Sequence, residues 1–317
     1  MRDFTKSNSI IKKLFYCFSR FLYAKFLSCI IKPLPKKQIN LEFLSLDCLD
    51  EEKQKHWRER IADVLSSPDN RYIPRESDAG KIKNGSLIMH NGLKIDPLSY
   101  CGYPMLKMLM ENRGAHEPQE ERVFYEILKK LPIRSVMIEL GSYWAFYSMW
   151  FHRKVKHPTC YMVEPNRTCL QTGKNNFILN KMHGNFLRAF VGDSSFVNEK
   201  GDKTICIDDF VEQNKIKFVH VLQADVQGKE LEMLKGSRNL FDNKKVGYVF
   251  VSTHSNDLHS ECLSILNNYN FIILASANLD ETYSYDGLIA ARAPYFDGID
   301  PLQISLKSKA NSVCPGI

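Results

Sequence analysis

Hydrophobic runs and helical stretches alternate along the second half of the chain. The runs are short and rich in Val, Ile, Leu and Phe, and they fall at residues 135–140, 160–163, 186–191, 219–224, 248–252, 271–274 and 288–291. Between them, segments such as 167–179 and 258–269 repeat apolar residues at helical spacing. Strands that alternate with helices favour a largely parallel sheet with helices on both faces. From about residue 132 the pattern therefore predicts an α/β fold of seven strands.

The pattern differs in front of this body. Residues 49–66 have helical spacing, and Asn91-Gly92 between two apolar runs is typical of a hairpin with a type I′ turn. The segment 10–31 carries apolar residues on one side of a helical wheel and basic residues on the other. We divide the chain into an N-terminal arm, a small α+β front region, an α/β body and a tail, at residues 1–39, 40–115, 116–293 and 294–317.

The positive charge of the protein is concentrated in the arm. The net charge of the whole chain is +7, and residues 1–40 hold nine Lys or Arg against a single acidic residue. Proteins that bind nucleic acid spread such charge over a folded face, so we expect no nucleic-acid partner. A basic amphipathic helix at 10–31 can lie on an anionic membrane, or it can pack on the body or on a second subunit; both interpretations stay open. No apolar run is long enough for a conventional transmembrane helix.

The cysteines indicate the compartment. Nine of them are scattered along the 317 residues without a C-x-x-C pair, which favours neither a disulfide framework nor a zinc site. We therefore predict a cytoplasmic protein, peripheral at the inner face of the membrane if the arm is an anchor. The content of 44% hydrophobic and 25% charged residues excludes a disordered chain.

Acidic residues and a glycine follow the first two predicted strands. Glu139 ends the first strand, and Gly141 makes the turn into a helix whose first N–H groups are free. Glu164 ends the second strand, where a carboxylate can accept hydrogen bonds from both hydroxyls of a ribose. A pyrophosphate needs a glycine-rich turn, and bulky residues follow Gly141 instead. A ligand with ribose and adenine but no phosphate fits these strand ends, and S-adenosylmethionine is such a ligand.

Two further strand ends carry an acid. Asp193 follows the third strand, where it could accept a hydrogen bond from the amino group of adenine. Asp225 follows the fourth strand and precedes Gly228 and a helix. Each acid alone is a common turn former. Because ligands of parallel sheets bind at the carboxyl ends of the strands, four acids at successive ends predict a binding site there.

Four segments of the body share the pattern of one known family: Glu139 to Ser148, Thr204 to Asp209, Asp225 to Gly236 and Asp286 to Ile289. Together they resemble the FkbM family of S-adenosylmethionine-dependent methyltransferases. The resemblance spans roughly residues 132–292, and its most specific part is the third segment. It implies a class I methyltransferase fold, which is Rossmann-like, and O-methylation, commonly of sugar hydroxyls in bacterial surface glycans.

The resemblance also implies which residues bind S-adenosylmethionine: Glu139, Gly141, Ser142, Ser148, Glu164, Asn166, Asp193 and Asp225. The first three would line its methionine side. Glu164 would bind the ribose and Asp193 the adenine side. Asp225 would lie near the transferred methyl group.

A sugar hydroxyl is a poor nucleophile at neutral pH, so a base or a metal ion should assist its attack. The candidates for the catalytic base are Asp225 and His254, which follows the fifth strand. The spacing supplies no complete set of metal ligands, so we expect no metal centre, and Mg²⁺ at Asp225 is an alternative that we do not favour. The stretch 116–120 could close over the cofactor.

Two departures from the family pattern motivate an alternative. Ala145 stands where the family usually has a second glycine, and Gln227 replaces the usual acid after Asp225-Val226. We expect an S-adenosylmethionine-dependent O-methyltransferase that acts on a sugar hydroxyl in a bacterial surface glycan. The alternative is a catalytically inactive scaffold or binding protein of a glycan-assembly complex. A nicotinamide oxidoreductase is disfavoured because the glycine-rich turn is missing.

Overall fold

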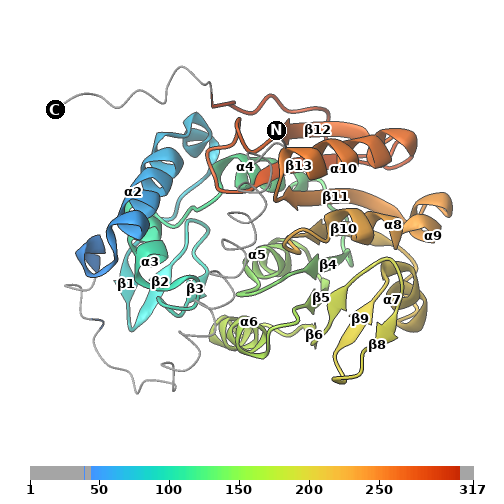
Figure 1. Ribbon diagram of the computed structural model, residues 1–317, viewed down its shortest axis with the longest axis horizontal. Coiled ribbons are helices and arrows are strands. Elements are labelled where there is room, and N and C mark those ends of the chain that lie inside the picture. Colours follow the sequence, from blue (N-terminus) through green and yellow to red (C-terminus); the bar gives the residue numbers. More distant parts are fainter. Residues whose placement is uncertain (1–38, 40–43, 308–317) are drawn as a thin grey trace, which may run out of the picture.

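The body of the protein is a central sheet with helices on both faces, beside a front layer built by α2 (Glu51–Ser66), α3 (Gly102–Glu111) and a small sheet (Figure 1). The computed structural model describes residues 39 and 44–307, so the predicted helix at 10–31 lies outside the described residues. Within the described part of the chain, no helix is long and apolar enough to cross a bilayer.

The central sheet has the strand order β12-β13-β11-β10-β4-β5-β6. Its strands are β4 (Val136–Leu140), β5 (Thr159–Val163), β6 (Asn185–Leu187), β10 (Val219–Ala224), β11 (Val246–Thr253), β12 (Ile272–Ala277) and β13 (Gly287–Arg292). All are parallel except β13, which runs antiparallel to both of its neighbours. The predicted seven-stranded α/β sheet is confirmed, and this strand order with one antiparallel strand is that of the class I methyltransferase fold.

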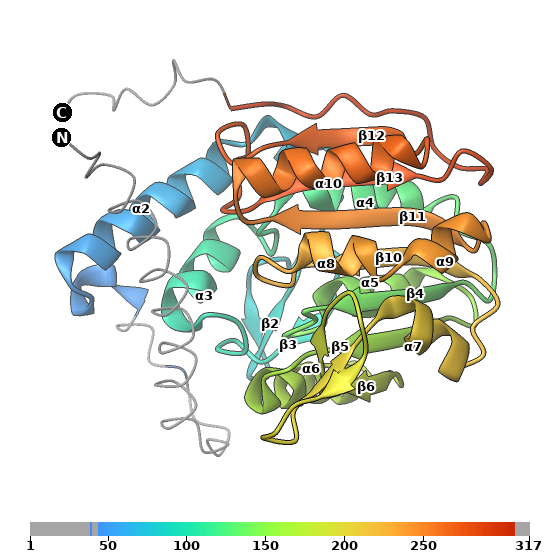
Figure 2. The same cartoon turned by 45° about the vertical axis from the view of Figure 1, so that its right-hand side comes forward.

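Alternate residues of each central strand enter two hydrophobic cores. In β11, Tyr248 and Phe250 belong to one core and Val249 and Val251 to the other. Figure 2 shows α8 and α10 on the near face of the sheet and α4 and α5 on the far face. Three helices cover the core on the far face: α4 (Pro118–Leu128), α5 (Phe146–Lys154) and α6 (Arg167–Leu179). Four helices cover the core on the near face: α7 (Ile207–Gln213), α8 (Glu230–Lys235), α9 (Arg238–Asp242) and α10 (Asn256–Asn268). Burial on both faces explains why these strands read as continuous hydrophobic runs.

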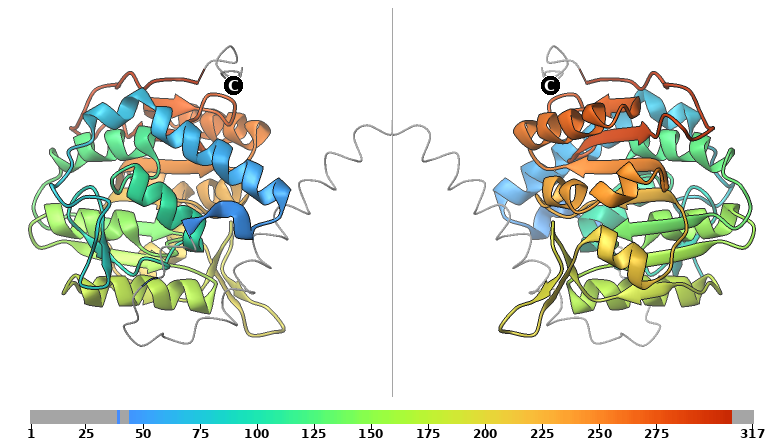
Figure 3. Two further views of the ribbon diagram at one scale, coloured as in Figure 1. Left: turned by 90° about the vertical axis from the view of Figure 1, so that its left-hand side faces the viewer. Right: turned by 90° about the vertical axis from the view of Figure 1, so that its right-hand side faces the viewer.

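The third predicted strand, at 186–191, is wrong as one element. It contains Arg188, whose guanidinium lies exposed and donates to the backbone oxygen of Pro165 and to Asp202. The central strand β6 therefore ends before Arg188, and β7 (Phe190–Val191) joins a separate sheet of order β7-β9-β8. In that sheet β8 (Phe196–Val197) and β9 (Lys203–Ile205) form a hairpin that extends away from the body (Figure 3).

The predicted hairpin around Asn91-Gly92 forms in the front layer, but its turn is not of type I′. It joins β2 (Ser86–Ile88) to β3 (Lys94–Ile95), and β1 (Ile82–Lys83) pairs with β2. A type I′ turn needs positive φ at both central residues, and of the two only Gly92 has it, at 78°. The side chain of Asn91 accepts a hydrogen bond from the backbone N–H of Leu93, which favours the wider loop that is seen.

The described part of the front layer shares one core with the body. Leu87 and Met105 of the front layer lie in the same buried cluster as Phe124 of α4 and Trp150 of α5. The front layer is therefore fixed against the far face of the sheet, close to the ends of the strands.

A buried ion cluster also joins the front layer to α4. The carboxylate of Glu121 lies 3.2 Å from Nε2 of His90, in the front hairpin, and 2.6 Å from Nδ1 of His116. Burial opposes ionisation of Glu121, but the two histidines outweigh it and lower its pKa to about 2. Burial also acts against the charged form of His116, yet Glu117 and Glu121 raise its pKa to about 10. Glu121 and His116 thus form a buried ion pair.

We predict that Glu121→Gln lowers the free energy of unfolding by about 3–5 kcal/mol, because it removes one of the two carboxylates that pair with the buried imidazolium of His116. Glu126→Gln, on the same helix but in an exposed pair with Lys129, should change it by less than about 1 kcal/mol. Urea unfolding of the two variants measures both values. Equal effects would show that the buried cluster does not stabilise the fold.

Candidate functional site

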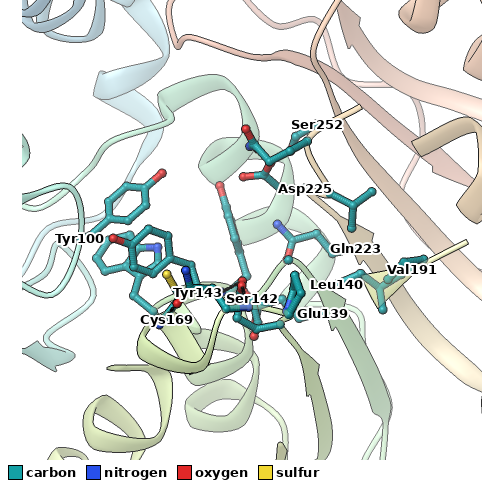
Figure 4. A pocket seen from close by; sticks show the side chains of 18 of the residues that line it. Tyr100, Glu139, Leu140, Ser142, Tyr143, Cys169, Val191, Gln223, Asp225 and Ser252 are labelled. Atoms are coloured by element: carbon teal, nitrogen blue, oxygen red, sulfur yellow. Dashed lines mark hydrogen bonds between the residues drawn. The ribbon is translucent and has the colours of Figure 1, made fainter. Parts of the chain in front are cut away.

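A cavity of about 440 Å³ opens at the carboxyl ends of β4, β5 and β10. Its volume is within the range of small-molecule sites, about 300–1,000 Å³. Figure 4 shows Glu139, Gln223 and Asp225 around this cavity, with Tyr100 and Tyr143 on the opposite side. Parallel sheets bind ligands at this edge, so the cavity is the candidate site.

The turn after β4 forms the floor of the cavity. Gly141 has a φ of 72°, and a Cβ there would lie 1.8 Å from the backbone oxygen of Asp225, so the turn can approach β10 this closely only with glycine. Glu139 is 4% exposed and accepts a hydrogen bond of 3.1 Å from the backbone N–H of Ser148. Burial raises the pKa of Glu139 to about 8. Glu139, Gly141 and Ser142 line the cavity, whereas Ser148 is buried outside the lining and holds Glu139 in place.

The bulky residues after Ser142 line the cavity and do not fill it. Tyr143 and Ala145 have φ values of 38° and 59°, in the left-handed region where glycine is usual. Ala145 thus adopts the conformation that the family's second glycine would take. The indole of Trp144 stacks on the ring of Tyr100, with 4.5 Å between centroids. The turn and the front layer together give the cavity an aromatic wall.

Glu164 stands at the end of β5 and faces the same cavity. Its two carboxylate oxygens accept hydrogen bonds from the backbone N–H groups of Tyr143, at 3.1 Å, and Asn166, at 2.8 Å. Burial raises the pKa of Glu164 to about 7. Asn166 also lines the cavity, and its side-chain oxygen caps α6 by accepting from the backbone N–H groups of Thr168 and Cys169.

Asp193 does not join the other predicted cofactor residues. It is exposed, hydrogen-bonds Ser194, and is not among the residues that line the cavity. Asp193 lies away from the cavity because the third predicted strand is split. The strand that precedes Asp193, β7, belongs to a separate sheet. Phe190 and Val191 of β7 line the cavity instead.

Part of the cavity wall comes from the front layer, which sequence reasoning missed, and from the segment just before α4. His116 and Glu117 line the cavity, from the stretch that was expected to close over the cofactor. The hydroxyl of Tyr147 donates to Glu117 over 2.8 Å, and Tyr100 enters from the front layer. No local signal marks Tyr100, because its place depends on contacts with residues far along the chain.

Asp225, His254 and Asp286 meet at one side of the cavity. His254 Nε2 lies 3.2 Å from Asp225 Oδ1 and 3.4 Å from Asp286 Oδ1. Its Nδ1 is 2.9 Å from Oε1 of Glu230, which is fully buried. Gln227 Nε2 lies 2.9 Å from Asp225 Oδ1 and 2.8 Å from His254 Nε2. Asp225 and Gln227 line the cavity, whereas His254 is outside the lining and contacts Asp225.

The carboxylates around His254 determine its charge. Burial lowers the pKa of the imidazole, but Asp286, Asp225 and Glu230 outweigh this effect and raise it well above its ordinary value. At neutral pH and without another cation, His254 is therefore an imidazolium, which has no lone pair to accept a proton. Sequence reasoning singled out His254 and Asp225 but did not anticipate Glu230 beside them.

The ionisable side chains that face the cavity are mainly acidic. Among the described residues of the lining, Glu117, Glu139, Glu164 and Asp225 are acidic, and the cationic side chains are Lys229 and His116. Lys229 pairs with Glu232, and His116 pairs with Glu117 and Glu121. Such a cavity suits a ligand with positive charge and hydroxyl donors, and it opposes a pyrophosphate. It therefore fits a sulfonium nucleoside.

Comparisons with known proteins agree with this chemistry. Residues 181–273 match the family model of the methyltransferase FkbM domain. The match confirms the predicted resemblance to FkbM methyltransferases and supports S-adenosylmethionine as the cofactor. The comparison with curated proteins found no match.

Several solved structures are similar at low identity. The FkbM methyltransferase of Methylobacillus flagellatus KT is 14% identical with a TM-score of 0.41, over 76% of this chain and 60% of that one. M. capricolum TrmK in complex with S-adenosyl-homocysteine is 14% identical with a TM-score of 0.38, over 56% and 71%. The precorrin-6y C5,15-methyltransferase of Geobacter metallireducens is 12% identical with a TM-score of 0.38, over 55% and 87%. Because these TM-scores are low, the fold assignment rests on the strand order of the sheet.

We predict that Gly141→Ala lowers the free energy of unfolding by more than about 3 kcal/mol, since a Cβ would collide with the backbone of Asp225. Gly85→Ala is the matched control, because Gly85 has a similar φ of 78° but no atom within 4 Å of its Cβ position. The control should lose only about 1 kcal/mol, from the left-handed backbone. Chemical denaturation compares the two, and similar losses would mean that the turn and β10 are not closely packed.

Proposed function

We propose that this protein is an S-adenosylmethionine-dependent O-methyltransferase that acts on a hydroxyl of a sugar in a bacterial surface glycan or a related glycoconjugate. The acidic cavity at the strand ends is the observation that carries the proposal. Four carboxylates face it, and the cationic groups in its lining are paired with acids. The FkbM family match supports the same conclusion.

Glu164 is the proposed ribose ligand. A carboxylate has about four lone-pair positions, and the backbone N–H groups of Tyr143 and Asn166 use two of them. Two remain for the hydroxyls of a ribose. Glu139, held by Ser148, is the proposed partner of the ammonium group, and the apolar wall at Phe190 and Val191 is the proposed contact of the adenine.

When bound, S-adenosylmethionine supplies a methyl group on a positively charged sulfur. The main task of the protein is therefore to hold the acceptor hydroxyl in line with that methyl, and such alignment is worth about 7–11 kcal/mol. Asp225 is the proposed catalytic residue, because its carboxylate faces the cavity and can orient the acceptor hydroxyl. His254 is a positioning residue in this proposal, since it contacts Asp225 from outside the lining and already carries a proton.

A saccharide acceptor is supported by the aromatic wall. Tyr100, Tyr143 and Trp144 line the cavity, and the C–H face of a pyranose ring can pack against aromatic side chains. Polar groups of Glu117 and Gln223 lie nearby and can bind sugar hydroxyls. The cytoplasmic location and the contact of residues 10–31 with a membrane stay predictions.

We predict that S-adenosylhomocysteine binds the wild-type protein more tightly as the pH rises from 6 to 8. The pKa of Glu164 is about 7 in the free protein, and its carboxylate accepts ribose hydrogen bonds fully only after losing its proton. Glu164→Gln should weaken binding by about 10- to 100-fold at pH 8 and reduce this pH dependence. Isothermal titration calorimetry measures both.

The control for this experiment is Asp193→Asn, which lies outside the cavity and should leave the affinity unchanged. A loss of affinity in Asp193→Asn together with wild-type affinity in Glu164→Gln would reject the ribose assignment and favour Asp193 as a ligand.

We also predict that Asp225→Asn reduces methyl transfer roughly 10²–10⁴-fold while the affinity for S-adenosylhomocysteine changes only several-fold. The assay follows labelled methyl groups from S-adenosylmethionine into surface glycan from cells that lack the protein. Asp257→Asn, at the exposed start of α10, is the control and should be as active as wild type. Cofactor binding by the wild-type protein without transfer to any glycan would favour the inactive scaffold suggested by Ala145 and Gln227.

A further inference from the structure

We propose that Asp225, His254 and Asp286 form a binding site for a first-row divalent cation, and that this site prefers Mn²⁺ over Mg²⁺. Within the described part of the chain, these three residues bring one nitrogen and two oxygen ligand atoms within 4.8 Å of one another. The existence of the site is independent of the proposed function, but its role in catalysis, given below, rests on methyl transfer to a hydroxyl.

The topology of the sheet brings the three side chains together. Asp225 follows β10 and His254 follows β11, so both lie at the carboxyl edge of the parallel strands. Asp286 directly precedes β13, which is antiparallel, so the start of this strand lies at the same edge. The one reversed strand of the sheet thus contributes the third ligand.

The distances between the ligand atoms suit a bound cation. His254 Nε2 is 3.2 Å from Asp225 Oδ1 and 3.4 Å from Asp286 Oδ1. Ligands that bind one ion at about 2.0–2.2 Å, at angles between 90° and 110°, lie roughly 3–3.5 Å apart. Both pairs that involve the histidine fall in this range before any side chain moves.

Glu230 holds His254 in the orientation of a ligand. The Nδ1–H of His254 donates to Glu230 Oε1 over 2.9 Å, and the same oxygen accepts from the backbone N–H groups of Val226 and Gly228. Histidine ligands of metals usually donate their second ring nitrogen to a carboxylate in this way, which fixes the tautomer. With Nδ1 held by Glu230, Nε2 is the ring nitrogen that faces the carboxylates of Asp225 and Asp286, at 3.2 and 3.4 Å.

The ligand types select the ion. Imidazole nitrogen favours first-row divalent cations such as Mn²⁺, Fe²⁺ or Zn²⁺ over Mg²⁺, which prefers oxygen ligands and keeps its waters. Two aspartates balance the charge of a divalent ion. The side chain of Asp286 is 8% exposed and that of His254 14%, whereas Asp225 is 27% exposed and lines the cavity. The site is therefore closed on the protein side and open toward the acceptor, as in catalytic metal sites with three protein ligands.

A cation at this place would assist the proposed reaction. A hydroxyl beside it loses its proton to solvent more readily. The O–H bond breaks as the new O–C bond forms, and the S–C bond of S-adenosylmethionine breaks to leave the neutral thioether. The cation would thus activate the acceptor hydroxyl beside Asp225, the ligand that lines the cavity.

The test is calorimetric titration of the chelator-treated, full-length protein with MnCl₂ and with MgCl₂. We expect one Mn²⁺ per chain, bound at least about tenfold more tightly than Mg²⁺. His254→Ala and Asp286→Asn should each weaken Mn²⁺ binding at least about 100-fold, and Glu230→Gln about 10- to 100-fold, because it only orients the ligand. His183→Ala, which removes an exposed histidine, should bind like wild type.

Gln227→Glu should increase the affinity for Mn²⁺, an effect that partial unfolding of the variant cannot produce. Gln227 already contacts both Asp225 and His254, so a carboxylate there should add an oxygen ligand and tighten Mn²⁺ binding. Absence of saturable Mn²⁺ binding in a wild-type protein that still binds S-adenosylhomocysteine would overturn the proposal, as would equal binding by wild type and His254→Ala. Mn²⁺ binding without methyl transfer would contradict the proposed function alone, whereas transfer that survives complete chelation would contradict the catalytic role of the cation.

Discussion

The gathering of carboxyl groups around one cavity is the constraint on which the rest of this structure depends. Glu139 and Glu164 are held by backbone N–H groups at the ends of adjacent strands, and burial raises the pKa of both. Carboxylates in such a place cost free energy until a cation or hydroxyl donors enter. Buried carboxyl groups therefore disfavour the empty cavity. They also favour binding of a positively charged nucleoside and oppose binding of a phosphate ligand.

The sheet creates this constraint through its topology. Parallel strands bring their acidic ends to one edge, and the single antiparallel strand β13 delivers Asp286 there from its opposite end. Gly141 lets the turn after β4 approach β10, which brings the acids of both strands to one cavity. The front layer adds Tyr100, which stacks on Trp144 of the turn after β4, and the contact of His90 with Glu121 joins this layer to α4.

Periodicity predicted the central sheet well, because strands buried on both faces read as continuous apolar runs. It also predicted the positions of Glu139, Glu164 and Asp225, since a residue that ends a parallel strand has little freedom in where it lies. Asp193 was predicted at the edge of the central sheet because residues 186–191 read as one unbroken strand. The exposed Arg188 interrupts this strand, so Asp193 lies elsewhere. Tyr100 and Glu230 could not be found in this way, because their places follow from packing between distant segments.

The most direct test of the account is a crystal structure of the full-length protein grown with S-adenosylhomocysteine. The account predicts the nucleoside in the cavity at the ends of β4 and β5, with both ribose hydroxyls within hydrogen-bonding distance of the Glu164 carboxylate. A nucleoside bound elsewhere, or a dinucleotide retained in this cavity with its phosphates beside Glu139 and Asp225, would contradict it.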